Sequence, residues 1–169
     1  MANKIPVILC SDDNYAKYLD VTLISILSNA SKDTFYDFYI LTTYDFSDEN
    51  KKMIQTELNK FQNNQIKFYD MSDFCKNIKL KKRWKTPTFF RLKAAEILPK
   101  EYEKCLYFDV DIIVNIDLWE LYNTNLDNNL IAGVRDPGVK YDIKHKTQKL
   151  KNKDYKMPNK KHYVNAGVL

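Results

Sequence analysis

The sequence contains few of the residues that form linkers, and it lacks any long apolar run. It has only three glycines and five prolines in 169 residues, which leaves little scope for flexible connections between domains. It has no run of about 18 apolar residues that would indicate a membrane-spanning helix. The first apolar run, residues 5–10, is too short for the core of a secretion signal and is typical of a strand. These shortages predict a single cytoplasmic domain.

The cysteines and histidines are also scarce. Cys10, Cys75 and Cys105 are odd in number and far apart, which fits neither a disulfide framework nor a zinc site. Two of the three lie within apolar strand-like runs, so we expect small, reduced residues in the core. His145 and His162 lie in a lysine-rich stretch, and we interpret both as exposed loop residues.

Positive charge is concentrated near the end of the sequence. The net charge is +5, and nine lysines against two aspartates fall within residues 140–161. We interpret this range as a solvated, lysine-rich loop, although it could also meet phosphate, anionic lipid or nucleic acid. Binding of nucleic acid is disfavoured, because the aromatic residues are mostly elsewhere and the stretch has no recognised binding motif.

Apolar runs and amphipathic segments alternate along the sequence. The expected strands are 5–10, 35–43, 65–69, 106–114 and about 130–134. The expected helices are about 15–29, a helix capped by Ser47, and 86–98 with a proline in its first turn. The capped helix would bury Met53, Ile54, Leu58 and Phe61. This alternation predicts an α/β fold with a mixed, mostly parallel sheet flanked by helices.

The segment LYFDVDIIV at 106–114 carries the clearest candidate site. It predicts an apolar, aromatic strand that ends in two carboxylates, Asp109 and Asp111. Because side chains in a strand alternate between faces, we expect both carboxylates on one side, about 6 to 7 Å apart along the backbone. Such oxygens bind Mg²⁺ or Mn²⁺ and leave positions open for substrate phosphates. Asp is also common where a strand ends in a turn, so the pair alone is weak evidence.

Polar residues follow three of the predicted strands. They are residues 12–14, the pair Asp109 and Asp111, and the pair Arg135 and Asp136. Ligands of open α/β sheets bind beyond the carboxyl ends of the strands, so these groups could converge on one cleft. Each group taken singly also suits a turn or a helix cap. Their coincidence at equivalent strand ends favours the functional interpretation.

Four segments together resemble glycosyltransferase family 8, which includes glycogenin and the bacterial lipopolysaccharide galactosyl- and glucosyltransferases. These segments are CSDDNY at 10–15, TFFRLK at 88–93, LYFDVD at 106–111 and YVNAGVL at 163–169. They occur in the order of the family and at its approximate spacing, over nearly the whole chain. The resemblance implies a GT-A fold, a Rossmann-like domain for a nucleotide-diphospho-sugar, over residues 1–169.

The resemblance implies a nucleotide site near the start of the chain. Asp12 and Asn14 would bind the uracil and ribose of a UDP-sugar through hydrogen bonds, and the ring of Tyr15 would offer a stacking face. The other residues that the resemblance places in this site are Cys10, Thr88 and Val110.

Further roles implied by the resemblance concern the diphosphate and the sugar. Arg91 would reach either of them with its forked donors. Asp109 and Asp111 would hold Mn²⁺, or Mg²⁺, across the diphosphate. Asp136 and Asn165 would line the donor-sugar pocket. The candidate catalytic residues are therefore Asp136, Asn165 and Arg91.

The activity implied by this resemblance is transfer of a hexose with retention at the anomeric carbon. The donor would be UDP-glucose or UDP-galactose, and the acceptor a hydroxyl of a saccharide or glycolipid in lipopolysaccharide or surface polysaccharide synthesis. We expect a cytoplasmic protein whose basic stretch could meet the inner face of the membrane. The alternative is a catalytically incomplete module that binds a UDP-sugar.

Two later segments of the family do not occur in this sequence. One is an acidic, amide-bearing motif, and the other is an HxxGxxKP segment that supplies a third metal ligand and a diphosphate lysine. We therefore expect the N-terminal portion of a longer enzyme, which binds UDP and Mn²⁺ weakly by itself. The apolar run that ends at Leu169 would then leave an edge that could associate with another chain.

Overall fold

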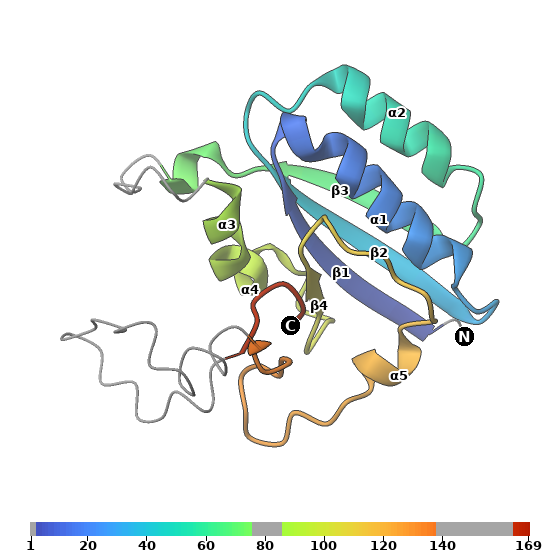
Figure 1. Ribbon diagram of the computed structural model, residues 1–169, viewed down its shortest axis with the longest axis vertical. Helices are drawn as coiled ribbons and strands as arrows, with labels where there is room; N and C mark the ends of the chain where they lie inside the picture. The colour runs from blue at the N-terminus through green and yellow to red at the C-terminus, as the bar shows by residue number, and fades with distance from the viewer. Residues whose placement is uncertain (1–2, 76–85, 138–163) are drawn as a thin grey trace. The chain divides into compact units, whose positions relative to one another are not determined.

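The computed structural model describes residues 3–75, 86–137 and 164–169, which are coloured in Figure 1. The chain divides into two compact units, Met1–Asn125 and Leu126–Leu169, and each is considered by itself. The lysine-rich range 140–161 and both histidines lie outside the described residues. The predictions for these positions therefore stay predictions.

Four parallel strands form the sheet of the first unit, in the order β3-β2-β1-β4. The strands are β1 (Asn3–Ser11), β2 (Thr34–Thr42), β3 (Asn64–Asp70) and β4 (Leu106–Phe108). Nearly every residue of β1 and β2 is buried, which explains their continuous apolar runs. The structure confirms the α/β fold and its sheet flanked by helices. Within the described ranges this sheet is wholly parallel rather than mixed.

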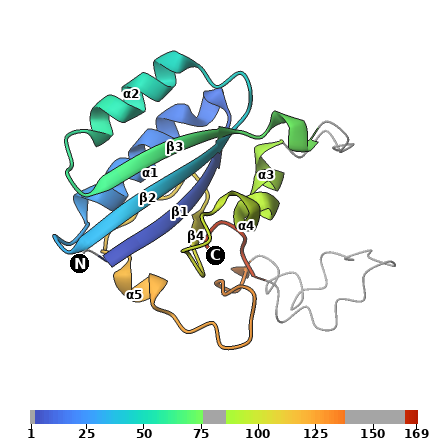
Figure 2. The ribbon, with the colours of Figure 1, turned by 180° about the vertical axis from the view of Figure 1, so that it is seen from behind.

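Two helices lie on the same face of the sheet (Figures 1 and 2). Helix α1 (Ala16–Ser28) follows the short turn η1 (Asp13–Tyr15), and α2 (Asp48–Leu58) follows β2. Helix α2 buries Ile54 and Leu58, whereas Met53 is 40% exposed, so its predicted burial is wrong. Met53 precedes Ile54 by one residue, about 100° around the helix, and faces away from the buried stripe.

The helix predicted at 86–98 is broken into three short pieces. They are α3 (Pro87–Phe90), η3 (Arg91–Lys93) and α4 (Ala94–Ile97). Pro87 lies in the first turn of α3, as predicted, and Phe90 is fully buried. Two other short helical pieces complete this unit, η2 (Ser72–Cys75) and α5 (Trp119–Tyr122). None of the helices within the described ranges is long and apolar enough to cross a membrane.

Two strand predictions are wrong. The strand predicted at 106–114 ends at Phe108, so strand alternation does not place Asp109 and Asp111 on one face. The strand predicted at about 130–134 does not form; its Leu130 is 97% exposed. In the second unit, the pairing found among the described residues is an isolated antiparallel bridge between Arg135 and Val164. Arg135 and Asp136 therefore do not follow a strand of the sheet.

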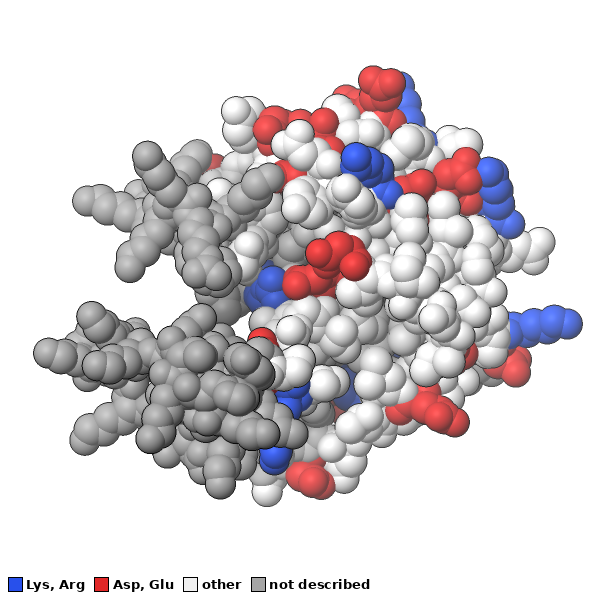
Figure 3. All heavy atoms as spheres, viewed as in Figure 1, with Lys and Arg blue, Asp and Glu red and all other residues white. Residues whose placement is uncertain are grey.

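The surface of α2 carries charges of both signs, seen as adjacent red and blue side chains over this helix in Figure 3. Lys51 pairs with Asp48 at 3.1 Å, and Lys60 pairs with Glu57, three residues earlier in each case. Exposed pairs of this kind contribute only about 0 to 1 kcal/mol to stability. Their main consequence is that the lysines of α2 and of the residues just after it do not form a purely basic surface.

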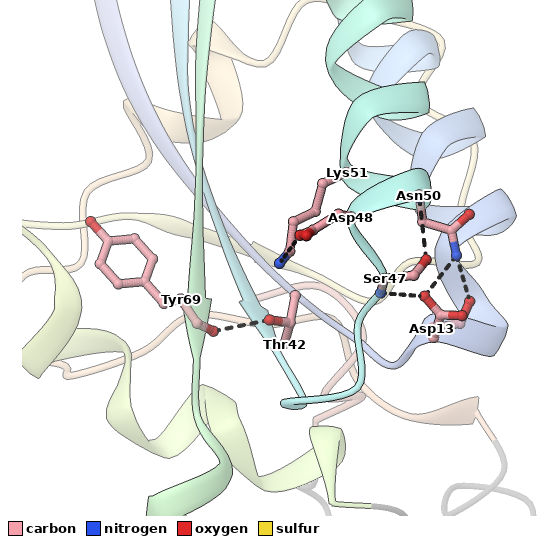
Figure 4. Close-up of polar contacts among 7 residues, drawn as sticks. All are labelled: Asp13, Thr42, Ser47, Asp48, Asn50, Lys51 and Tyr69. Carbon is pink, nitrogen blue, oxygen red and sulfur yellow. Dashed lines mark hydrogen bonds and ion pairs between the residues drawn. The ribbon is translucent and has the colours of Figure 1, made fainter.

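Asp13 joins the loop after β1 to the N-terminus of α2 (Figure 4). Its Oδ1 accepts hydrogen bonds from the backbone N–H of Ser47 at 2.8 Å and from Nδ2 of Asn50 at 2.7 Å. The hydroxyl oxygen of Ser47 caps α2, as predicted, by accepting from the backbone N–H of Asn50 at 3.2 Å. These hydrogen bonds, first the one from the Ser47 backbone, lower the pKa of Asp13 below its ordinary 3.8.

We expect Asp13→Ala to lower the free energy of unfolding by about 1 to 2 kcal/mol at pH 7, because two donors lose their acceptor. A carboxylate whose pKa is lowered by folding stabilises the fold above the pKa of the unfolded chain, and this contribution is lost as the pH falls through the folded pKa. The difference in the free energy of unfolding between wild type and Asp13→Ala, measured by urea unfolding, should therefore be smaller at pH 3 than at pH 7. Asp13→Asn keeps an acceptor oxygen and should retain part of the stability. An equal loss of stability at pH 7 and at pH 3 in Asp13→Ala would contradict this role of the Asp13 carboxylate.

Candidate active site

The candidate site lies at the carboxyl ends of β1 and β4. Leu9 pairs with Phe108 in the register of these two strands, so Cys10 and Asp109 follow on neighbouring strands. The loop of Asp12 continues from β1 at the same end of the sheet. This is the end at which open α/β sheets bind their ligands.

Asp109 is held in place through its side chain. Its Oδ1 accepts a hydrogen bond from the hydroxyl of Tyr107 at 2.7 Å and one from Nη2 of Arg91 at 3.0 Å. The guanidinium carbon of Arg91 lies 4.3 Å from the centre of the Tyr107 ring, and Nε of Arg91 donates to the carbonyl of Thr88 at 2.9 Å. A hydrogen-bonded ion pair and a stacked cation therefore fix this carboxylate.

The two carboxylates after β4, Asp109 and Asp111, are of the chemical kind that binds a divalent cation. Oδ1 of Asp109 is occupied by its two donors, while Oδ2 accepts no hydrogen bond from the part of the chain that the structure describes. Asp111 is exposed. Hard carboxylate oxygens of this kind suit Mg²⁺ or Mn²⁺. Within residues 3–75, 86–137 and 164–169, however, no cluster of three or more such ligands is present.

Cys10 is buried next to this cluster and stays a thiol. Its side chain is 8% exposed, and burial raises its pKa to about 12 against the opposing influence of the Arg91 charge. A thiol with this pKa is neither a nucleophile nor an anionic ligand near neutral pH. Burial likewise raises the pKa of Tyr107, so its phenol stays protonated and donates to Asp109. Cys10 and Cys105 are free thiols, as predicted.

The predicted uridine residues form the loop after β1. The carboxylate of Asp12 accepts from the backbone N–H of Tyr15 at 3.1 Å, which caps the turn η1. Asn14 is exposed. Tyr15 is 40% exposed, and the centre of its ring lies 5.3 Å from that of the Tyr18 ring. Val110, by contrast, is buried, and its carbonyl oxygen accepts a hydrogen bond from the Thr22 hydroxyl at 2.8 Å.

Two predicted site residues lie in the second unit. The backbone N–H of Asn165 donates to the carbonyl of Val134 at 2.7 Å, and its side-chain oxygen accepts from the backbone N–H of Gly167 at 2.8 Å. Asp136 follows the bridge that Arg135 makes with Val164. Their place in a donor-sugar pocket stays a prediction.

Sequence reasoning assigned no role to Tyr107, although its position contained the necessary signal. Tyr107 precedes Asp109 by two residues, a spacing that would put both side chains on one side of an extended segment, although β4 itself ends at Phe108. A phenol at that position can reach the carboxylate, as the 2.7 Å hydrogen bond shows.

The sequence model of glycosyl transferase family 8 matches residues 6–169 of the chain. The chain belongs to glycosyltransferase family 8. A curated protein from Haemophilus influenzae, whose name includes the word glycosyltransferase, is 32% identical to this family 8 chain. The alignment covers 96% of this chain and 47% of the Haemophilus influenzae protein. The lipopolysaccharide 1,3-galactosyltransferase of Salmonella typhimurium is 23% identical, over 79% of this chain and 39% of its own length.

Solved structures confirm that this family 8 chain has the GT-A fold. The bifunctional glycosyltransferase WbbM, without ligand, superposes with a TM-score of 0.85 at 26% identity, over 99% of this chain and 31% of its own. An active-site mutant of LgtC has a TM-score of 0.72 at 27% identity, over 97% of this chain and 56% of its own. The chain spans between 39% and 54% of the length of the curated relatives that it matches.

Proposed function

We propose that this family 8 chain carries the donor-binding half of a retaining hexosyltransferase that uses UDP-glucose or UDP-galactose. The observation that carries the proposal is Asp109, a carboxylate fixed by Arg91 and Tyr107 at the ligand-binding end of the sheet. The similarity to LgtC supports it, because that galactosyltransferase has a structure in complex with donor and acceptor sugar analogues.

The uridine would lie against the loop after β1. Asp12 and Asn14 offer polar groups for the base and ribose, and the exposed part of the Tyr15 ring offers a stacking surface. Stacking of a base on an aromatic side chain contributes about 1 to 3 kcal/mol in proteins that bind single-stranded nucleic acids.

The diphosphate would lie between the carboxylates and Arg91. Asp109 and Asp111 would hold a divalent cation, Mn²⁺ or Mg²⁺, which when bound supplies positive charge to the diphosphate leaving group. The forked N–H donors of an arginine match phosphate oxygens, and Arg91, which lies beside Asp109, would contact the diphosphate. Asp136 and Asn165 are the residues of the second unit that would contact the donor sugar.

The acceptor and the location in the cell are part of the same proposal. The name of the Salmonella typhimurium relative supports an acceptor in lipopolysaccharide or surface polysaccharide synthesis. A cytoplasmic protein of this kind would meet its acceptor at the inner face of the membrane, and the nine lysines within residues 140–161 would favour an anionic surface.

Calorimetric titration of the chain tests the donor. UDP, UDP-glucose and UDP-galactose should bind in the presence of Mn²⁺ and lose most of their affinity when EDTA is added, whereas ADP-glucose should bind poorly under both conditions. Equal affinity for uridine and adenosine nucleotides would contradict the proposed uridine site. Affinity that is indifferent to EDTA would contradict the proposed cation site.

The second candidate is a UDP-sugar-binding module without transfer activity. Such a module would need only the donor-binding residues, the loop after β1 and the carboxylate of Asp109 that Arg91 and Tyr107 hold. An assay for release of UDP from UDP-glucose separates the two functions. Binding without any release of UDP, in the chain and in a version extended beyond Leu169, would support the module.

A further inference from the structure

Thr22 holds the backbone on both sides of Asp111. Its hydroxyl lies 2.8 Å from the carbonyl oxygen of Val110 and 2.9 Å from that of Ile112, so one proton is shared between two acceptors. Thr22 is buried, with 1% of its surface exposed. Serine and threonine hydroxyls in helices often bond within the helix, but this one donates to a segment 88 to 90 residues away.

Two further side chains of the same helix face hold the next part of that segment. The Ser25 hydroxyl accepts from the backbone N–H of Val114 at 3.0 Å and donates to the carbonyl of Thr22 at 2.7 Å. Nδ2 of Asn29 donates to the carbonyl of Val114 at 2.9 Å. Thr22 and Ser25 lie on one side of α1, and Asn29 follows as its C-cap. We call these three residues the α1 ladder.

The two carboxylates of the candidate site are therefore fixed in different ways. Asp109 is held through its side chain by Arg91 and Tyr107. Asp111 is exposed, and within the described ranges its carboxylate has no hydrogen bond or ion pair. Its orientation therefore depends on its own backbone, whose two flanking carbonyls are bonded to Thr22.

We propose that Thr22 is a positioning residue for Asp111: its hydroxyl fixes the backbone of this residue and thereby presents the carboxylate in one orientation. The inference rests on the proposed function for its consequence, which is cation affinity. If the segment fluctuates, only a fraction of the molecules presents both carboxylates correctly, and the apparent affinity is the intrinsic affinity multiplied by that fraction.

Three variants isolate the hydroxyl of Thr22. Thr22→Val has nearly the same shape and lacks the hydroxyl, whereas Thr22→Ser keeps it. Thr56→Val is the matched control, because the Thr56 hydroxyl donates to the carbonyl of Lys52 at 2.7 Å on the exposed side of α2, away from the segment. Circular dichroism first establishes a temperature at which all three variants are folded.

The first measurement is hydrogen exchange of the peptide that covers residues 109–114, without metal or nucleotide. Thr22→Val should accelerate hydrogen exchange in this peptide by about tenfold or more. Thr22→Ser and Thr56→Val should each accelerate it by less than about threefold. The second measurement is Mn²⁺ affinity at saturating UDP, by electron paramagnetic resonance. Thr22→Val should weaken it by about 10- to 100-fold, and Thr22→Ser should restore it.

The two measurements keep the inference separate from the proposed function. Unchanged exchange in Thr22→Val overturns the inference whatever the metal result. Faster exchange with unchanged Mn²⁺ affinity also overturns it, because Thr22 would then support the fold without positioning Asp111. Absence of Mn²⁺ binding in the unsubstituted chain contradicts the proposed function, and the exchange measurement then decides alone whether Thr22 fixes this backbone.

Discussion

Asp111→Asn should weaken Mn²⁺ affinity at saturating UDP by about 100-fold or more, because an amide keeps an oxygen but loses the charge that a hard cation needs. The same substitution should change the free energy of unfolding by less than about 0.5 kcal/mol, as is usual for surface positions. The reason is that Asp111 is exposed. Titration by electron paramagnetic resonance and urea unfolding measure the two effects on the same samples.

Asp109→Asn should behave differently, although it removes the same charge from the proposed cation site. Here the carboxylate also accepts from Tyr107 and from Arg91, whose side chain is only 16% exposed. Loss of a charged hydrogen-bond partner in such a setting costs about 1.5 to 3 kcal/mol. We therefore expect Asp109→Asn to weaken both Mn²⁺ affinity and stability, whereas Asp111→Asn weakens affinity alone.

Asp33→Asn is the control for both variants. Asp33 is exposed and lies just before β2, at the beginning of a strand rather than beyond its carboxyl end. The substitution Asp33→Asn changes the net charge by the same amount as the other two variants. It should leave Mn²⁺ affinity within about twofold of the wild type, because exposed charges farther apart than about 10 Å are largely screened at 0.1 M salt. Wild-type affinity in Asp111→Asn would refute the proposed carboxylate pair.

The central part of the fold was predictable because its signals are local. Strands β1 and β2 are covered on both faces, so they appear in the sequence as continuous apolar runs. Helix α2 follows a capping serine and buries Ile54 and Leu58 at helical spacing. Each of these features depends on residues within one turn or one strand.

The end of β4 was not predictable, because long-range hydrogen bonds decide it. The residues IIV at 112–114 favour a strand by composition. In the structure, however, the carbonyls of Val110, Ile112 and Val114 accept from the α1 ladder, 85 to 90 residues earlier in the chain. No local pattern indicates which helix side chains will take these bonds. For the same reason the sequence did not indicate the role of Thr22, because no local pattern distinguishes it from other threonines in helices.

The site was only partly predictable for a related reason. The family resemblance pointed to Asp109 and Arg91, and the structure brings these two into contact. It did not indicate that Tyr107 would share the same carboxylate oxygen. The apolar run at 130–134 gave a false strand, because a short run forms a strand only where a neighbour pairs with it.

Asp117 should be the carboxylate on which the stability of the first unit most depends. Its Oδ2 accepts from the backbone N–H of Ser31 at 2.8 Å and from the hydroxyl of Tyr36 at 3.2 Å, and its Oδ1 accepts from the backbone N–H of Trp119 at 2.9 Å. Tyr36 is fully buried, and its oxygen accepts in turn from the backbone N–H of Leu118 at 3.0 Å. One side chain thus joins the loop before β2, β2 itself and the start of α5.

Asp117→Ala should lower the free energy of unfolding by about 3 kcal/mol, because a buried hydroxyl and two backbone N–H groups lose a charged acceptor. For a chain of this length the melting temperature should fall by about 6 to 12 °C. Urea unfolding and calorimetry measure these changes. Tyr36→Phe removes the other end of one of these bonds, so the double variant should be less destabilised than the sum of the single variants by about 1 kcal/mol. Additive losses would show that the two side chains act independently.

The pH dependence gives a second, independent test of Asp117. Burial alone would raise its pKa, but the hydrogen bonds from the N–H groups of Ser31 and Trp119 and from neighbouring hydroxyls outweigh burial and lower the pKa below 3.8. The stabilisation is therefore present above the pKa of the unfolded chain and is lost as the pH falls through the folded pKa. The stability difference between wild type and Asp117→Ala should be full at pH 7 and shrink on acidification below about pH 4.

The effect of Asp117 on stability should be separable from the candidate site. Ser31 and Tyr36 lie before and near the start of β2, whereas Asp109 follows the carboxyl end of β4, so the two carboxylates lie at opposite ends of a parallel sheet. At a temperature where Asp117→Ala is folded, it should keep the Mn²⁺ and UDP affinity of the wild type, while Asp111→Asn keeps the stability and loses the affinity. A loss of affinity in folded Asp117→Ala would instead mean that the segment 110–117 transmits strain to Asp111, and the α1 ladder would then not be enough to fix that carboxylate.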